Sequence, residues 1–282
     1  GEILLDYKGD RGDFQIGRSM LNTPLTKIAY SLTPNFYSAA MGTLRPMKGL
    51  SLKAGLITEM SFGARAATDW GLIGERTPTA GAAVNPVKER GGIGQGEFFD
   101  ISQMVRGINA PSTKGISVLN ATYKGVENLT LAGWNYYADD IANTMYFEGD
   151  YAIPVKSMKS KLTFSGQYMR QRATGDKIAN GTFGGTNDDL DYDLLGAKVA
   201  LGNKKWGVYA AANSSSGDTW FLNAFGGDPA YTSTIFSRNA YRENVDAWKV
   251  GGRFSPIKGV NLIAQYADYG QSDSLGYFGP AG

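Results

Sequence analysis

Residues 161–170 read KLTFSGQYMR and alternate apolar with polar side chains. The apolar members are Leu162, Phe164, Gly166 and Tyr168. A period of two is the signature of a β-strand, in which successive side chains point to opposite faces. The stretch therefore predicts a strand with one apolar face and one polar face.

The same alternation recurs along the chain and predicts about twelve strands. The first two are expected around residues 3–7 and 14–16. The others are expected at 37–45, 50–58, 116–123, 129–138, 145–153, 161–170, 192–201, 206–214, 247–254 and 260–269. A short helix is expected at 98–105. Aromatic residues near strand ends, among them Trp134 and Trp248, fit the aromatic belts of membrane proteins.

The connections between these strands fall into two classes. Short polar turns are expected at 9–12, 46–49, 124–128, 154–160, 202–205 and 255–259. Longer connections are expected at 20–36, 63–113, 139–144, 174–191 and 215–246. Because the two classes alternate, all short turns come to one end of the strands and all long loops to the other. This asymmetry is typical of outer-membrane barrels, so the pattern predicts an all-β, transmembrane antiparallel β-barrel.

The composition is compatible with that fold. The chain has 282 residues, of which 42% are hydrophobic, and its mean hydropathy is −0.26. No apolar run reaches the roughly 18–20 residues of a transmembrane helix, whereas a barrel strand needs only about 9–11 residues with one apolar face. The whole chain, 1–282, is therefore interpreted as a single β-barrel domain.

Charge and residue content exclude several function classes. The 28 basic and 26 acidic residues give a net charge of +2 without a basic block, which gives no support to nucleic-acid binding. The chain has no Cys and no His, so thiolate metal sites and Ser-His-Asp catalysis are excluded within these residues. The acidic run at 188–193 lacks calcium-loop spacing and is interpreted as a solvated loop. We expect no enzyme activity, no metal and no cofactor.

A succession of short motifs gives the chain a family resemblance. The motifs are GRS (17–19), NTP (22–24), LTPNF (32–36), KGLSLKAG (48–55), YYADDI (136–141), YAIP (151–154), LGAKV (195–199), AANSSSGD (211–218) and GVNL (259–262). In this order and spacing they resemble the OprD family of Gram-negative outer-membrane porins. The 63–113 segment has no counterpart among these motifs. The family's barrel has eighteen strands, so the resemblance implies that this chain is the central portion of a longer protein.

The resemblance also implies a set of pore residues. Residues 20–36 correspond to an inward-folded constriction loop, whose polar members are Thr23, Lys27, Tyr30 and Ser31. A basic ladder along the wall is expected to include Arg18, Lys27, Arg45, Lys53, Lys198, Lys249 and Arg253. The acidic side of the constriction is expected to come from the 215–246 loop, with Asp228, Tyr231, Ser233 and Ser237.

The function predicted from these features is passive diffusion of small hydrophilic solutes, anionic or zwitterionic, across the bacterial outer membrane. Amino acids, peptides and organic acids are the expected solutes. The expected surroundings are a lipid bilayer with lipopolysaccharide, and the expected assembly is a monomer or a homotrimer. One alternative is a structural or adhesive barrel that binds a partner through the 63–113 and 215–246 loops. Another is a soluble β-sandwich or lipocalin-like barrel whose apolar face points inward, because alternation alone does not say which face is buried.

Overall fold

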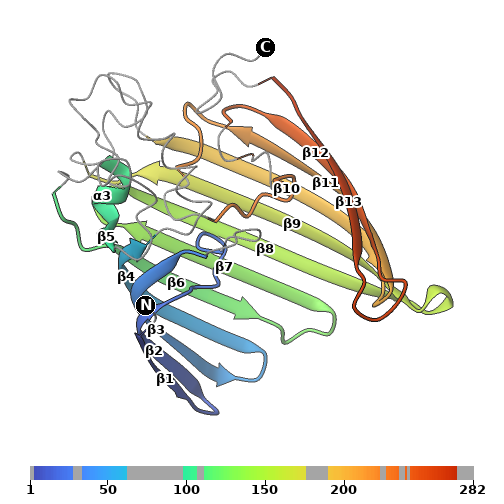
Figure 1. The fold of residues 1–282 in the computed structure, drawn as a ribbon, viewed down its shortest axis with the longest axis horizontal. Coiled ribbons are helices and arrows are strands. Elements are labelled where there is room, and N and C mark those ends of the chain that lie inside the picture. The colour runs from blue at the N-terminus through green and yellow to red at the C-terminus, as the bar shows by residue number, and fades with distance from the viewer. Residues whose placement is uncertain are drawn as a thin grey trace.

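A computed structural model describes residues 3–27, 34–61, 98–106, 111–175, 190–222, 227–234, 239 and 242–271. Within these residues the chain forms one 13-stranded antiparallel sheet. Twelve of the strands pair in chain order, each with its neighbours in sequence, and β1 and β13 each pair on one side only. The described sheet is therefore an open, curved wall (Figure 1).

All twelve predicted strands are present. They are β1 (Ile3–Lys8), β2 (Gly12–Ser19), β3 (Phe36–Met47), β4 (Leu50–Ser61), β6 (Ile116–Tyr123), β7 (Leu129–Ala138), β8 (Ala142–Val155), β9 (Ser160–Ala173), β10 (Asp191–Gly202), β11 (Trp206–Ser216), β12 (Asp246–Phe254) and β13 (Leu262–Tyr269). Several run further toward the long loops than predicted: β8 starts at Ala142 rather than at 145, because the β7–β8 connection is a tight turn closed by the Ile141 amide on the Ala138 carbonyl.

The predicted short helix exists as α3 (Ile101–Arg106), and it begins after a two-residue strand, β5 (Phe99–Asp100), that pairs with β4. The Asp100 carboxylate accepts hydrogen bonds from the backbone amide and hydroxyl of Ser102, which fixes the start of the helix. No helix in the described part of the chain is long and apolar enough to cross a membrane.

The two classes of connection separate in space. Figure 1 shows the short turns together at one end of the strands, and α3 with the described parts of the longer connections at the other. The pairing is continuous along almost every strand, with register shifts only within β3–β4 among the described pairs. Because paired residues point to the same side of a sheet, this register assigns each strand residue to a face.

One face of the sheet is apolar and exposed. Paired residues such as Tyr151, Phe164 and Val199 lie in one row, and their side chains are 49%, 44% and 43% exposed. Leu195, in a neighbouring row of the same face, is 64% exposed. A soluble β-sandwich would bury these rows in its core, so that alternative is wrong. The apolar rows form the outer face of a transmembrane β-barrel wall, as the alternation predicted.

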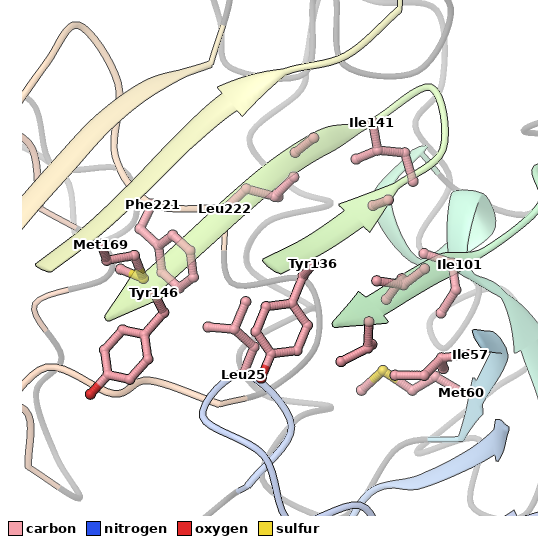
Figure 2. Packing of buried hydrophobic residues seen from close by; sticks show 14 of the residues in the cluster. Leu25, Ile57, Met60, Ile101, Tyr136, Ile141, Tyr146, Met169, Phe221 and Leu222 are labelled. Atoms are coloured by element: carbon pink, nitrogen blue, oxygen red, sulfur yellow. The ribbon is translucent and has the colours of Figure 1, made fainter. Parts of the chain in front are cut away.

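The buried side chains gather on the opposite, inner face near the long-loop end. Figure 2 shows Leu25, from the β2–β3 connection, and Phe221 and Leu222, from the β11–β12 connection, packed with wall residues such as Tyr136 and Met169. All five belong to one cluster of buried hydrophobic residues. Two connections that are far apart in sequence therefore fold back into the space that the wall encloses.

A charge on the outer rows should destabilise the protein in a bilayer. We expect Phe164→Arg to lower the free energy of unfolding by about 2–4 kcal/mol, the cost of arginine on the lipid face near the midplane. Thr163→Arg, one residue away on the inner face, should cost far less. Denaturant titration of the protein refolded into lipid vesicles measures both values. Equal losses for the two variants would contradict the assignment of faces.

Candidate functional site

One inner row of the wall carries charges of both signs. The register pairs Asp150 of β8 with Ser165 of β9, Ser165 with Lys198 of β10, and, across Ala211, Lys198 with Lys249 of β12. Strands are spaced about 4.8 Å apart, so the Cα atoms of Asp150 and Lys198 lie about 10 Å apart, and those of Lys198 and Lys249 likewise. The Ser165 hydroxyl donates a hydrogen bond to the Asp150 carboxylate at 2.5 Å.

The next inner row adds a second carboxylate. Glu148 of β8 pairs with Gln167 of β9, which pairs with Gly196 of β10. A Cβ at Gly196 would lie 2.3 Å from the amide nitrogen of Asn213 and 2.6 Å from Cγ of Gln167, so a larger residue would displace these side chains. Glu148 and Asp150 form an acidic patch on β8, two strands away from Lys198 of β10.

Residues 227–234 of the β11–β12 connection lie against these charges, and we call them the inner segment. The Tyr231 hydroxyl donates to the Glu148 carboxylate at 3.0 Å, and the Lys198 ammonium lies 4.2 Å from the centre of the Tyr231 ring. The Lys249 ammonium donates to the Ser233 carbonyl at 2.7 Å. Burial and the neighbouring Glu148 carboxylate raise the pKa of the Tyr231 hydroxyl, so it stays protonated at neutral pH and remains a donor.

Further hydrogen bonds tie the inner segment to the wall. The Thr232 amide donates to the Asn213 side chain of β11 at 2.9 Å, and the Tyr269 hydroxyl of β13 donates to the Thr232 carbonyl at 2.8 Å. Upstream on the same connection, the Leu222 amide donates to Gln171 of β9 at 2.7 Å. The connection thus crosses the inner face, and these bonds fix it to β9, β11 and β13 in addition to β8 and β12.

The β2–β3 connection, from the other end of the sheet, contacts the inner segment. The hydroxyls of Thr23 and Thr26 are 2.8 Å apart, and the Thr26 hydroxyl donates to the Leu21 carbonyl at 2.8 Å, which closes a compact turn. The Gly227 amide then donates to the Leu25 carbonyl at 2.9 Å. A Cβ at Gly227 would lie 2.4 Å from the carbonyl carbon of Leu25, so only glycine permits this contact.

The register sorts the predicted basic ladder by face and by level. Lys53, Lys198 and Lys249 are on the inner face, and Lys198 and Lys249 contact the inner segment. Arg45 and Arg253 are also on inner rows, but they are exposed near the short-turn end, where Arg45 forms an ion pair with Asp13 and Arg253 donates to the Lys204 carbonyl at 3.3 Å.

Arg18 lies on the outer face and not with the ladder. It pairs with Ile3 and with Ser38. On β2 it faces the same side as the exposed Phe14 and Ile16. Its guanidinium lies 3.4 Å from the Glu59 carboxylate and 4.1 Å from the centre of the Phe98 ring. Trp134, predicted for a membrane interface, is on the inner face in the row of Asn120 and Tyr146.

The predicted loop residues have mixed positions. Thr23 is buried in the turn described above, and Lys27 is exposed. Asp228 accepts hydrogen bonds from the Ser233 hydroxyl at 2.6 Å and the Ala230 amide at 3.1 Å, within the inner segment itself. Tyr30, Ser31 and Ser237 lie outside the described residues, as does most of the 63–113 segment.

The main residues that the sequence reasoning missed are Glu148 and Asp150. The acidic groups of the site were expected from the 215–246 loop, and Asp228 of that loop does lie near enough to Lys249 to act on its charge. Glu148 and Asp150 are additional carboxylates that come from β8. In the sequence they alternate with Phe147, Gly149 and Tyr151, a pattern that assigns them to the polar face. The signal was present, but nothing local marked these carboxylates as partners of the loop.

Solved structures of outer-membrane channels match the fold of this chain. OccK2 (OpdF) of Pseudomonas aeruginosa, solved in complex with glucuronate, superposes with a TM-score of 0.73 at 14% identity, over 98% of this chain and 65% of that one. OpdK with vanillate gives 0.72 at 14% identity, over 96% and 63%. OpdQ gives 0.69 at 16% identity, over 99% and 66%.

The chain has the fold of these channels. They are OprD-family porins, so the fold implied by the motif resemblance is confirmed. OpdK is described as an outer membrane protein, which agrees with the predicted location. The chain spans 63% to 66% of the length of the three structures. No family model matches the sequence, and neither does any curated protein.

Substitution of Gly227 should separate the two inward connections. We expect Gly227→Ala to increase hydrogen–deuterium exchange in residues 21–27 and 227–234, because the added Cβ collides with the backbone of residues 24–26. Gly166→Ala is the matched control, since a Cβ there meets nothing within 4 Å. Exchange followed by mass spectrometry measures both. Unchanged exchange in Gly227→Ala would show that the connections are not held by this contact.

Proposed function

We propose that the protein is a passive diffusion channel of the bacterial outer membrane for small hydrophilic solutes that carry a carboxylate. The observation that carries this proposal is the charged inner row, where Lys198 and Lys249 stand at the level at which two connections narrow the interior. Selectivity in such a pore follows from its width and from the charges that line it.

The geometry supports non-covalent selection. At long range the ammonium groups of the inner wall attract a solute carboxylate. Glu148 and Lys198 are in contact with Tyr231, and Lys249 is bound to the Ser233 carbonyl. Direct contact with a solute is therefore proposed for Lys53, toward a carboxylate, and for Asp150, toward a cationic group. Both interactions are strengthened where the inward connections exclude bulk water and lower the local dielectric. Anionic and zwitterionic solutes therefore fit this wall better than cations do.

The solved channels support the substrate class in general terms. OccK2 was solved with glucuronate and OpdK with vanillate, and both ligands are small organic acids. We extend to this chain only their shared chemistry, a carboxylate on a small ring. Swelling of liposomes that contain the full-length protein should be faster in glucuronate or vanillate than in a cationic solute of similar size.

A lysine of the inner wall should contribute to charge selectivity, and an arginine of the outer wall should not. We expect Lys53→Gln to lower the chloride-to-potassium permeability ratio of the full-length channel by roughly twofold, because it removes one lumen charge. Arg170→Gln removes the same charge from the outer face and should leave the ratio unchanged. Reversal potentials in planar bilayers under a KCl gradient give both ratios.

Two outcomes would argue against the proposal. A purified and correctly inserted full-length protein that conducts no ions would exclude a diffusion channel. Equal effects of Lys53→Gln and Arg170→Gln would show that the inner row does not line the conducting path.

A further inference from the structure

Tyr231 contacts two wall groups of opposite charge at the same time. Its hydroxyl donates to the Glu148 carboxylate at 3.0 Å, while the Lys198 ammonium lies 4.2 Å from the centre of its ring. A phenol is well suited to this double contact, because its hydroxyl is a donor and its ring face attracts cations. The side chain is 9% exposed, so the contacts are made away from bulk water.

The two charges belong to different strands. Glu148 is on β8 and Lys198 on β10, and β9 lies between them. Ser165 and Gln167 of β9 face the same side and are 7% and 3% exposed. Neither polar atom of the Gln167 side chain has a hydrogen-bond partner among the described residues. Tyr231 therefore spans a polar strip of wall from its acidic to its basic side.

We propose that Tyr231 is a specificity-determining residue, which sets the charge selectivity of the pore by keeping Glu148 and Lys198 from a passing solute. This inference rests on the proposed channel function. It adds the residue that controls charge selectivity and the direction in which its substitution should change the permeability ratio. With both groups engaged, neither the Glu148 carboxylate nor the Lys198 ammonium is free to bind a solute.

The two contacts can be separated by chemistry. Tyr231→Phe removes the hydroxyl and releases Glu148, but it keeps a ring against Lys198. One negative charge then faces the lumen, and cations should pass more easily. Glu148→Gln removes that carboxylate. In the double variant, Tyr231→Phe therefore has no charge left to release.

The test uses the full-length protein in planar bilayers with a KCl gradient. We expect Tyr231→Phe to lower the chloride-to-potassium permeability ratio by roughly twofold. The same substitution in a Glu148→Gln background should leave the ratio within error of Glu148→Gln alone. A merely structural role of the tyrosine would produce the same change in both backgrounds.

Tyr168→Phe is the matched control. Tyr168 also donates its hydroxyl to a carboxylate, that of Asp193 at 2.5 Å, but on the outer face of the wall. Its removal should not alter the permeability ratio. An equal shift in Tyr168→Phe and Tyr231→Phe would overturn the proposal.

The outcomes separate this inference from the channel function. Absence of conductance in the unmodified protein would refute the function, whereas normal conductance with an unchanged ratio in Tyr231→Phe would refute only the role of Tyr231. If Tyr231→Phe does not insert into the bilayer, the permeability ratio of Glu148→Gln tests the proposal. If Tyr231 shields Glu148, Glu148→Gln should change the ratio less than Lys53→Gln does. An equally large change would overturn the proposal.

Discussion

Continuous backbone pairing between neighbouring strands is the constraint on which the rest of the structure depends. Each strand from β1 to β13 pairs with the next along the path, and register shifts among the described pairs occur only within β3–β4. Paired residues share a face, so the alternation of one strand is passed to the next. Exposed apolar rows on one side and charged rows on the other are consequences of this register, and the inward connections have a wall to lie against because of it.

Most of the wall could be predicted from the sequence because a period of two is a local property. The twelve strands and their two faces follow from it, since neighbouring residues are sufficient to reveal it. Arg18 shows where the prediction failed through insufficient use of the same rule. It is two residues from Ile16 and four from Phe14, so the alternation assigns it to the apolar face with them. The assignment to the pore wall followed the family motif around Arg18 instead of this alternation.

The positions of the inward connections could be predicted only in outline. That long connections fold inward was suggested by the family resemblance, but which wall groups they contact depends on pairs far apart in sequence. Tyr231 and Glu148 are separated by 83 residues. Gly227 of the β11–β12 connection bonds to Leu25 of the β2–β3 connection, which comes from the opposite end of the sheet. A periodic pattern of side chains gives no information on such long-range contacts. Glu148 could therefore be assigned to the polar face, but its contact with Tyr231 could not be predicted.

The wall and the inward connections therefore depend on different kinds of interaction. The wall is held by backbone hydrogen bonds, to which every residue except proline can donate an N–H group. The inner segment is held mainly by individual side chains, such as Tyr231, Asn213 and Lys249, each of which contributes only modestly to stability. Substitutions at these positions can change the charged groups of the inner face while the wall keeps its backbone pairing. In the proposed channel, selectivity can therefore differ from that of proteins with the same fold, such as OccK2, which superposes with a TM-score of 0.73 at 14% identity.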